Sequence, residues 1–109
     1  MIRHVVLYKY HKDIPDEVIQ GVYEKLDEIS ARLPGRLSYS WGKYDSYEGR
    51  NQGFTHCLIT DFSDEAARKA FIDDPVRVLF SKEEVQPRVV DGINGIISFD
   101  FTWETAPKK

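Results

Sequence analysis

The sequence predicts one α+β domain with the ferredoxin-like order β-α-β-β-α-β, in which a four-stranded antiparallel sheet carries its helices on one face. Two periodicities support this fold class. Four stretches show the alternation and the β-branched and aromatic residues of strands, and two stretches repeat apolar residues with the period of a helix. The length of 109 residues fits a single domain over residues 1–109, with residues 104–109 expected as a frayed tail.

The first half of the chain supplies two strands and the longer helix. Residues 2–10 are rich in valine, leucine and tyrosine and predict the first strand. We expect Asp13 to cap the helix that follows, with Pro15 in its first turn and the proline and glycine at 34–35 ending it. Residues 36–43 alternate as a second strand. The apolar stripe of the helix consists of Val18, Ile19, Val22, Tyr23, Leu26, Ile29 and Leu33.

The second half repeats this pattern with shorter elements. Residues 53–62 predict the third strand, and Ser63 is expected to cap a second helix. Asp74-Pro75 ends that helix and begins a short helical turn. Residues 81–84 have the form of a capping box for one more turn, and residues 96–103 predict the last strand.

One face of the predicted sheet has no helix to cover it. Apolar residues gather there in the first and last strands, namely Val5, Leu7, Ile97, Phe99, Phe101 and Trp103. An apolar patch of this size is seldom left in contact with water. We therefore expect a homodimer in which two copies pack sheet against sheet.

The composition argues against several classes of partner. The net charge of −3 is mixed in sign, and no basic tract or basic helix face indicates nucleic acid or an anionic membrane. No apolar run approaches the length of a membrane span, and the first ten residues do not read as a signal peptide. Cys57 is the only cysteine, which excludes an internal disulfide and favours the cytoplasm.

Four short motifs in order resemble the stress-responsive A/B barrel (Dabb) family. They are IRHVVLYKY at 2–10, which contains His4; WGK at 41–43; GFTH at 53–56; and ISFDFT at 97–102, which contains Asp100. The similarity is strongest to the plant members of the olivetolic acid cyclase and hydroxynitrile lyase kinds. The resemblance implies a dimeric α/β barrel with a small-molecule pocket inside each monomer, between the sheet and the helices.

The chain departs from these plant members after the third strand. Where they carry Tyr-Ile-x-His-Pro-x-His, residues 71–77 read Phe-Ile-Asp-Asp-Pro-Val-Arg. The phenol is replaced by Phe71, and the family's basic histidine is replaced by Arg77. A guanidinium stays charged and cannot act as a general base. The resemblance therefore implies the family's fold, but not the cyclase or lyase mechanism of those relatives.

Two histidines and one aspartate are the candidate catalytic residues. By parity, His4 and His56 lie on the helix side of neighbouring strands, and we expect their imidazoles to converge in one pocket as an acid–base pair. The alternative is that each is a buried histidine bonded to a backbone carbonyl. Asp100, between two phenylalanines, needs a partner; it either orients a histidine or forms an ion pair with Arg77.

Four further residues are expected to bind the substrate: Arg77, Tyr8, Tyr23 and Phe71. Arg77 would hold a carboxylate or enolate oxygen at the pocket mouth, or else be a solvated charge on a short helix. The two tyrosines would present hydroxyl groups to the pocket, or else belong to the core.

The chemistry expected from this pattern needs no cofactor. The histidines and the cysteine show no short metal-ligand spacing, so we expect no metal site. The glycines form no phosphate-binding loop. The weak alternative is a divalent ion bound by Asp45 and Glu48 in the polar loop. The expected function is a lyase, isomerase or cyclase acting on a small, partly apolar and in part acidic substrate. Two alternatives stay open: a non-catalytic stress-responsive or ligand-binding protein, and a heme- or quinol-directed monooxygenase suggested by fold analogy alone.

Overall fold

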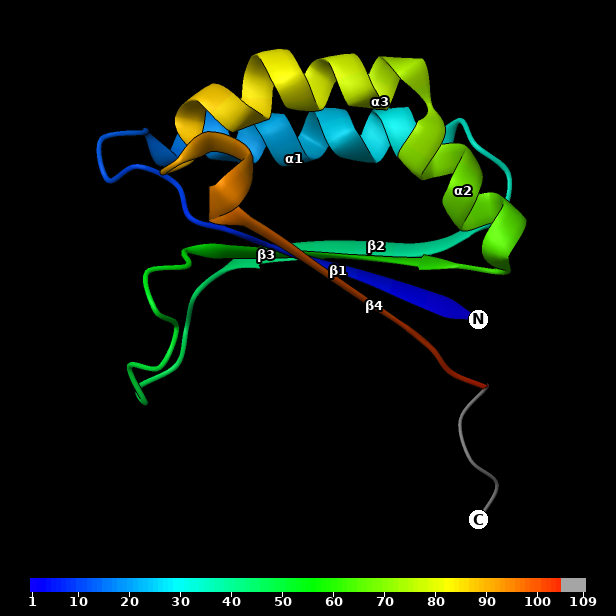
Figure 1. Ribbon diagram of the computed structural model, residues 1–109, viewed down its shortest axis with the longest axis horizontal. Helices are drawn as coiled ribbons and strands as arrows, with labels where there is room; N and C mark the ends of the chain where they lie inside the picture. The colour runs from blue at the N-terminus through cyan, green and yellow to red at the C-terminus, as the bar shows by residue number, and fades with distance from the viewer. Residues whose placement is uncertain (105–109) are drawn as a thin grey trace.

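Four antiparallel strands form one sheet in the order β2-β3-β1-β4 (Figure 1). The strands are β1 (Ile2–Tyr8), β2 (Arg36–Lys43), β3 (His56–Phe62) and β4 (Ile96–Thr102). This is a computed structural model, and it describes residues 1–104. It confirms the predicted antiparallel sheet and the neighbouring first and third strands. Residues 105–109 of the expected frayed tail lie outside the described residues.

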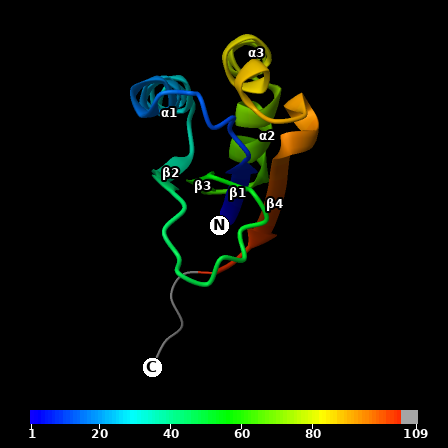
Figure 2. The same cartoon turned by 90° about the vertical axis from the view of Figure 1, so that its left-hand side faces the viewer.

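The three α-helices of residues 1–104 cover the same face of the sheet, as predicted (Figures 1 and 2). They are α1 (Asp16–Ala31), α2 (Glu65–Asp73) and α3 (Pro75–Phe80). Figure 2 shows α1 and α3 side by side above the sheet, with α2 between α3 and the strands. The chain continues from α3 through a π-helical turn η1 (Ser81–Val85) and two 3-10 turns, η2 (Gln86–Arg88) and η3 (Gly92–Gly95), before β4 begins.

The core lies between the sheet and the helices. Every second residue of β1 is buried against the helices, namely Ile2, His4, Val6 and Tyr8. The apolar stripe of α1 meets them with Ile19, Val22, Tyr23, Leu26 and Ile29. The faces that meet in the core are thus the ones that the strand alternation and the helical period predicted.

Three expected caps are wrong. The α1 helix begins after Pro15 with no side-chain cap, so Asp13 has no such role. Asp64, not Ser63, caps α2 by accepting a hydrogen bond from Ala67 N at 2.9 Å. The expected further turn is present as η1, but Ser81 does not cap it: its backbone is already helical and its N–H bonds to the carbonyl of Arg77. The helical start at Pro75, by contrast, is confirmed.

The side of the sheet away from the helices, here called the outer face, is apolar. It carries Val5, Leu7, Ile59, Ile97, Phe99 and Phe101. Phe99 is 67% exposed and Phe101 42% exposed in the single chain. The polar loop between β2 and β3 lies on this same side of the sheet (Figures 1 and 2). In the single chain, the outer face is therefore exposed, with the β2–β3 loop beside it.

A carboxylate is paired at one end of the outer face. Asp61 accepts two hydrogen bonds from the Arg3 guanidinium, at 2.8 and 3.0 Å, and one from the Ser38 hydroxyl at 2.8 Å. These bonds, chiefly those from Arg3, hold the pKa of the Asp61 carboxyl below its ordinary value. The charged form of Asp61 therefore stabilises the fold.

Acidification should remove the stability that Asp61 contributes. Because its pKa is lower in the folded chain than in the unfolded one, where it is about 3.9, this contribution is present above that value and is lost as the pH falls through the folded pKa. We expect Asp61→Asn to lower the Tm at pH 7, with the difference from wild type shrinking below about pH 4. Thermal unfolding followed by circular dichroism checks this. Asp73→Asn, at the exposed end of α2, is the control, and an equally pH-dependent difference there would contradict the assignment.

Candidate functional site

A cavity of about 210 Å³ lies between the sheet and the helices. Its polar lining groups come from His4 and Tyr8 of β1, Arg77 of α3, Ser81 of η1 and Ser98 of β4; Phe71 and further apolar side chains complete its wall. We call this space the inner cavity. It lies below the roughly 300 Å³ at which pockets for drug-sized ligands begin, so it suits a small molecule.

A larger hollow of about 650 Å³ lies on the other side, between the β2–β3 loop and the outer face. Leu7, Cys57 and Ile97 of the outer face form its floor, and loop residues such as Asp45 and Glu48 form its wall. This volume falls within the range of ligand pockets, but the wall of the hollow is a polar loop and its floor is the outer face. His4, Tyr8 and Arg77 instead line the inner cavity, and the description below follows them.

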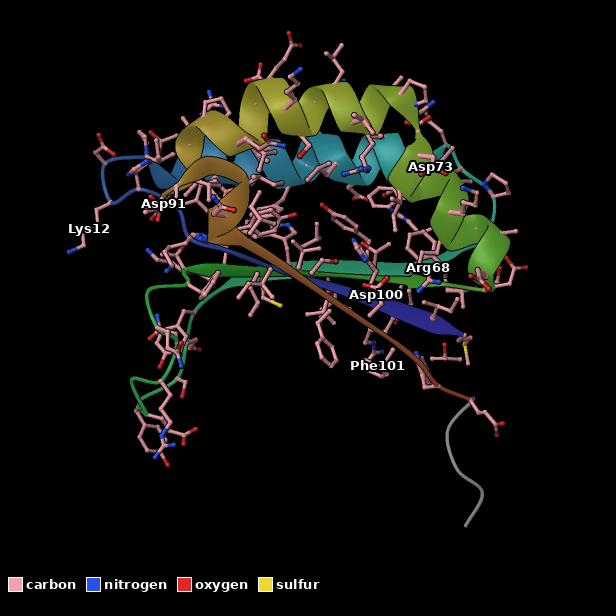
Figure 3. All side chains as sticks on the ribbon, in the orientation of Figure 1. Lys12, Arg68, Asp73, Asp91, Asp100 and Phe101 are labelled. Atoms are coloured by element: carbon pink, nitrogen blue, oxygen red, sulfur yellow. The ribbon has the colours of Figure 1, made fainter. Side chains whose placement is uncertain are left out.

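His4 is held by a carboxylate at the wall of the inner cavity. The β1–β4 register places Asp100 opposite His4, and the distance from His4 Nδ1 to Asp100 Oδ1 is 2.7 Å. Arg68 of α2 donates to the other carboxylate oxygen at 3.3 Å. Figure 3 shows Arg68 and Asp100 facing each other on the helix side of β4. An ionised carboxylate only accepts, so Nδ1 carries the proton of this hydrogen bond, and in the neutral imidazole Nε2 is the nitrogen that can accept.

This arrangement decides between the two expected partners of Asp100. The carboxylate orients a histidine, and the expected pairing with Arg77 is wrong. Arg68 takes that place, and the sequence analysis missed it. Its position three residues before buried Phe71 is the signal that would have placed it on the inner face of α2.

Arg77 lines the inner cavity, so the alternative of a freely solvated charge is wrong. Its Nε donates to the Phe71 carbonyl at 3.0 Å and its Nη2 to the Ile72 carbonyl at 2.7 Å. The guanidinium also lies over the Phe71 ring, 5.3 Å from its centroid. Burial lowers the pKa of Arg77, yet a guanidinium remains charged in proteins. The side chain is thus a fixed, half-buried cation that closes the last turn of α2.

His56 does not join His4, so the expected convergence of the two histidines is wrong. Both are buried on the helix side, but His56 pairs with Tyr8 and His4 pairs with Thr60. Four residues therefore separate them along the strand direction, about 13 Å at the usual rise. His56 lines the larger hollow and not the inner cavity.

The immediate surroundings of His56 fit a structural residue. Its Nδ1 lies 2.8 Å from Thr55 Oγ1, and that hydroxyl donates to the Tyr8 carbonyl. With its proton so used, Oγ1 accepts from His56 Nδ1–H. Burial, helped by the nearby Lys43, lowers the pKa of His56. The imidazole is therefore held neutral in an aromatic part of the core.

Of the three remaining expected substrate-binding residues, two line the inner cavity and one does not. Tyr8 and Phe71 line the inner cavity, and the Phe71 ring meets the His4 ring edge-on at 6.0 Å. Burial raises the pKa of Tyr8, so its phenol stays protonated and can donate. Tyr23 is fully buried and stacks on Trp41 at 4.7 Å, outside the lining of the cavity, as a core residue does.

Neither a metal centre nor a membrane helix is found in the part of the chain that the structure describes. No three His, Cys, Asp or Glu side chains are grouped there so as to hold an ion, including Asp45 and Glu48. No helix of residues 1–104 is long and apolar enough to cross a membrane.

Known proteins share this architecture. HS1, a stress-response A/B barrel domain-containing protein of Arabidopsis thaliana, is 25% identical over 80 residues, which are 73% of each chain. A dimeric ferredoxin-like protein of unknown function from Jannaschia sp. CCS1 is 20% identical with a TM-score of 0.83, covering 94% of this chain and 98% of the other. Hydroxynitrile lyase from Passiflora edulis is 24% identical with a TM-score of 0.77, covering 97% and 96%.

At these identities the two solved structures establish a common fold. The family assignment comes from the sequence itself. The model of the stress responsive A/B barrel domain (Dabb) matches residues 2–103, which is nearly the whole chain, and this agrees with the motifs that contain His4 and Asp100. The protein belongs to the Dabb family.

Proposed function

We propose that the protein is an enzyme of the lyase, isomerase or cyclase type, in which His4 transfers a proton in the inner cavity without a cofactor. The observation that carries this proposal is the His4–Asp100 hydrogen bond of 2.7 Å at the wall of a core cavity. His4 is 8% exposed, so its imidazole meets the cavity and little bulk water. A histidine oriented by a carboxylate in a dry site is a recurrent acid–base device.

Each partner has a defined part in the proposed proton transfer. Asp100 holds the tautomer with Nδ1 protonated and stabilises the imidazolium that forms when Nε2 accepts a proton. Arg68, bonded to the second oxygen of Asp100, holds the carboxylate in place. Tyr8 donates a hydrogen bond to an oxygen that gains negative charge. His56 has no part in this step.

Cleavage of a hydroxynitrile is a suitable probe reaction, because a lyase of this kind has the same fold. Nε2 of His4 would take the hydroxyl proton, the bond from carbon to the nitrile would break, and its electron pair would leave with cyanide. The imidazolium would then return the proton to cyanide. A carbonyl compound and hydrogen cyanide are released, and His4 is regenerated.

A screen of small carbon acids tests the proposal. Mandelonitrile cleavage is followed by the absorbance of benzaldehyde, and proton exchange next to a carbonyl is followed by NMR in heavy water for a panel of small ketones. We expect turnover above the buffer rate for at least one compound, and its loss in His4→Gln. Compounds that bind the inner cavity with no turnover would favour the second candidate.

The second candidate is a non-catalytic ligand-binding protein. It is favoured by Phe71, which lacks a hydroxyl, and by Arg77, two of whose nitrogens bond to backbone carbonyls. Neither residue can accept a proton. The monooxygenase alternative has no residue of the inner cavity to support it and rests on fold analogy.

We also propose that the protein acts as a homodimer through the outer face. The motive is the exposure of Phe99, Ile97 and Phe101 on a face that no helix covers. Several hundred Å² of contiguous apolar surface commonly mark an interface. The fold neighbour from Jannaschia is a dimeric protein, which supports the proposal of a dimer. We place this dimer in the cytoplasm, where the lone, half-buried Cys57 would stay reduced.

A further inference from the structure

The inner cavity contains one permanently charged side chain. Arg77 is that residue, and the groups around it are apolar or carry hydroxyls, apart from the imidazole of His4. Asp100 lies behind His4 and is not part of the lining. The electrostatic character of the cavity is therefore set by one guanidinium.

No carboxylate of residues 1–104 forms an ion pair with Arg77. The nearest acidic residue in sequence is Asp74, whose Oδ2 accepts from Arg32 Nη2 at 2.7 Å and from the backbone N–H of Arg77 at 3.1 Å. Asp74 is thus committed to capping α3 and to Arg32. Asp73 and Asp74 favour the charged guanidinium without forming an ion pair with it, and neither lines the inner cavity. An anion inside the cavity would therefore supply a direct partner that the lining lacks.

The guanidinium is already fixed for such a partner. Its Nε and Nη2 are anchored to the carbonyls of Phe71 and Ile72, and its plane lies over the Phe71 ring. Nη1 has no hydrogen-bond partner among residues 1–104. Because the side chain is held by three contacts, little rotamer freedom remains to be lost when a ligand binds.

We infer that the inner cavity takes a small monocarboxylate with an apolar body, and that Arg77 binds its carboxylate. The inference rests on the proposed function, because it names the substrate class of the same cavity. A single negative charge matches the single cation, whereas a phosphate dianion would leave an uncompensated charge in a mostly apolar space. Ser81 and Ser98 supply further hydroxyl donors, and the volume of about 210 Å³ suits a molecule of the size of benzoate.

Binding of benzoate and of neutral benzamide, which has nearly the same shape, tests the inference. Two-dimensional NMR of the ¹⁵N-labelled protein gives the affinity of each and shows which residues they meet. We expect benzoate to bind wild type about tenfold or more tightly than benzamide, with shift changes at Val6 and Ser98. Arg77→Gln should remove this preference, and Arg77→Lys should keep part of it. Arg88→Gln should behave as wild type, because Arg88 is also anchored to a backbone carbonyl, that of Glu84, but does not line the inner cavity.

Two outcomes would overturn the inference. One is equal affinity of wild type for both compounds. The other is a preference for benzoate that survives in Arg77→Gln, or that is accompanied by shift changes only outside the inner cavity. Arg77→Gln loses the bonds to α2 and could fail to fold for that reason. The inference is then tested by the preference of wild type for benzoate, by the residues whose shifts change, and by the preference of Arg77→Lys.

The inference and the proposed function fail in different ways. Benzoate binding does not need a proton acceptor, so His4→Gln should retain it. Arg77-dependent binding with no His4-dependent turnover would sustain the inference and reject the enzyme. His4-dependent turnover of neutral compounds, at the same rate in Arg77→Gln as in wild type, would sustain the enzyme and reject the inference.

Discussion

Replacing His4 with glutamine should lower the rate of proton transfer in the inner cavity by about 10²–10⁴-fold. Glutamine can still donate a hydrogen bond to Asp100, so the pairing of β1 with β4 should survive. What is lost is Nε2, the proton acceptor. The change should therefore fall on kcat, with KM nearly unchanged and the thermal unfolding curve close to that of wild type. Steady-state kinetics on the compound found in the carbon-acid screen measures it.

The matched control is His56→Gln. This residue is also a buried histidine on the helix side, and it is hydrogen-bonded to Thr55 rather than to a carboxylate. Because it does not line the inner cavity, its replacement should leave kcat within a factor of a few of wild type. An equal loss in both variants would refute the assignment of His4 as the acceptor, since it would indicate a shared effect on the fold.

Asp100→Asn separates orientation from acceptance of the proton. The amide fits the same space beside His4 but removes the negative charge that stabilises the imidazolium. Because the imidazolium that forms during proton transfer loses this stabilisation, kcat should fall by about tenfold or more while the fold is retained. Steady-state kinetics measures the change, with circular dichroism to verify the fold. An unchanged kcat would mean that Asp100 serves only to pair β4 with β1 and α2.

The faces of the sheet were predictable from the sequence, because side chains alternate along a strand. The parity of β1 placed His4 and Tyr8 towards the helices and Val5 towards the outer face, and the structure agrees. The position of a residue along the strand is a different matter, since it depends on how neighbouring strands are paired. His4 and His56 share a face yet lie four residues apart in the register. Parity gives the face of a residue but not its position along the strand, so the prediction of one pocket shared by His4 and His56 was wrong.

The partners of charged side chains were less predictable than the faces. Asp100 required a partner, and the sequence offered His4 and Arg77 without deciding between them. Pairing of β1 with β4 brings His4 opposite, and the turn from α2 into α3 carries Arg77 to the carbonyls of Phe71 and Ile72. Helix junctions of this kind depend on backbone geometry around Pro75 that periodicity does not describe. Arg68 is a different case, because its spacing of three residues from Phe71 would have placed it on the inner face of α2.

Placing a charge at Phe99 should abolish the proposed dimer while sparing the monomer. Phe99 is 67% exposed in the single chain, so Phe99→Glu puts a carboxylate into water and costs the isolated fold little. In a two-fold dimer through the outer face, the same carboxylate would be buried twice, once in each copy. An uncompensated buried charge costs about 3–5 kcal/mol, so the dimer Kd should rise by about a thousandfold or more.

Phe99 is better suited to this test than Phe101. The Arg3 guanidinium lies 5.9 Å from the Phe101 ring, so a glutamate at 101 would find a cation beside it. Figure 3 shows Phe101 on the side away from the helices, as its parity requires. Phe99 instead pairs with Val5 in the β1–β4 register, and Val5 provides no counter-charge. The free-energy cost of burying an unpaired charge in the dimer is therefore larger at position 99 than at position 101.

Sedimentation velocity at micromolar concentration measures the outcome, with far-UV circular dichroism to verify the fold. Wild type and Leu79→Glu should sediment as dimers, and Phe99→Glu as a folded monomer. Leu79 is the matched control because it is 54% exposed on α3, on the opposite side of the molecule. A monomeric wild type would reject the dimer outright. A dimeric Phe99→Glu, or a Leu79→Glu that dissociates instead, would move the interface from the outer face to the helices.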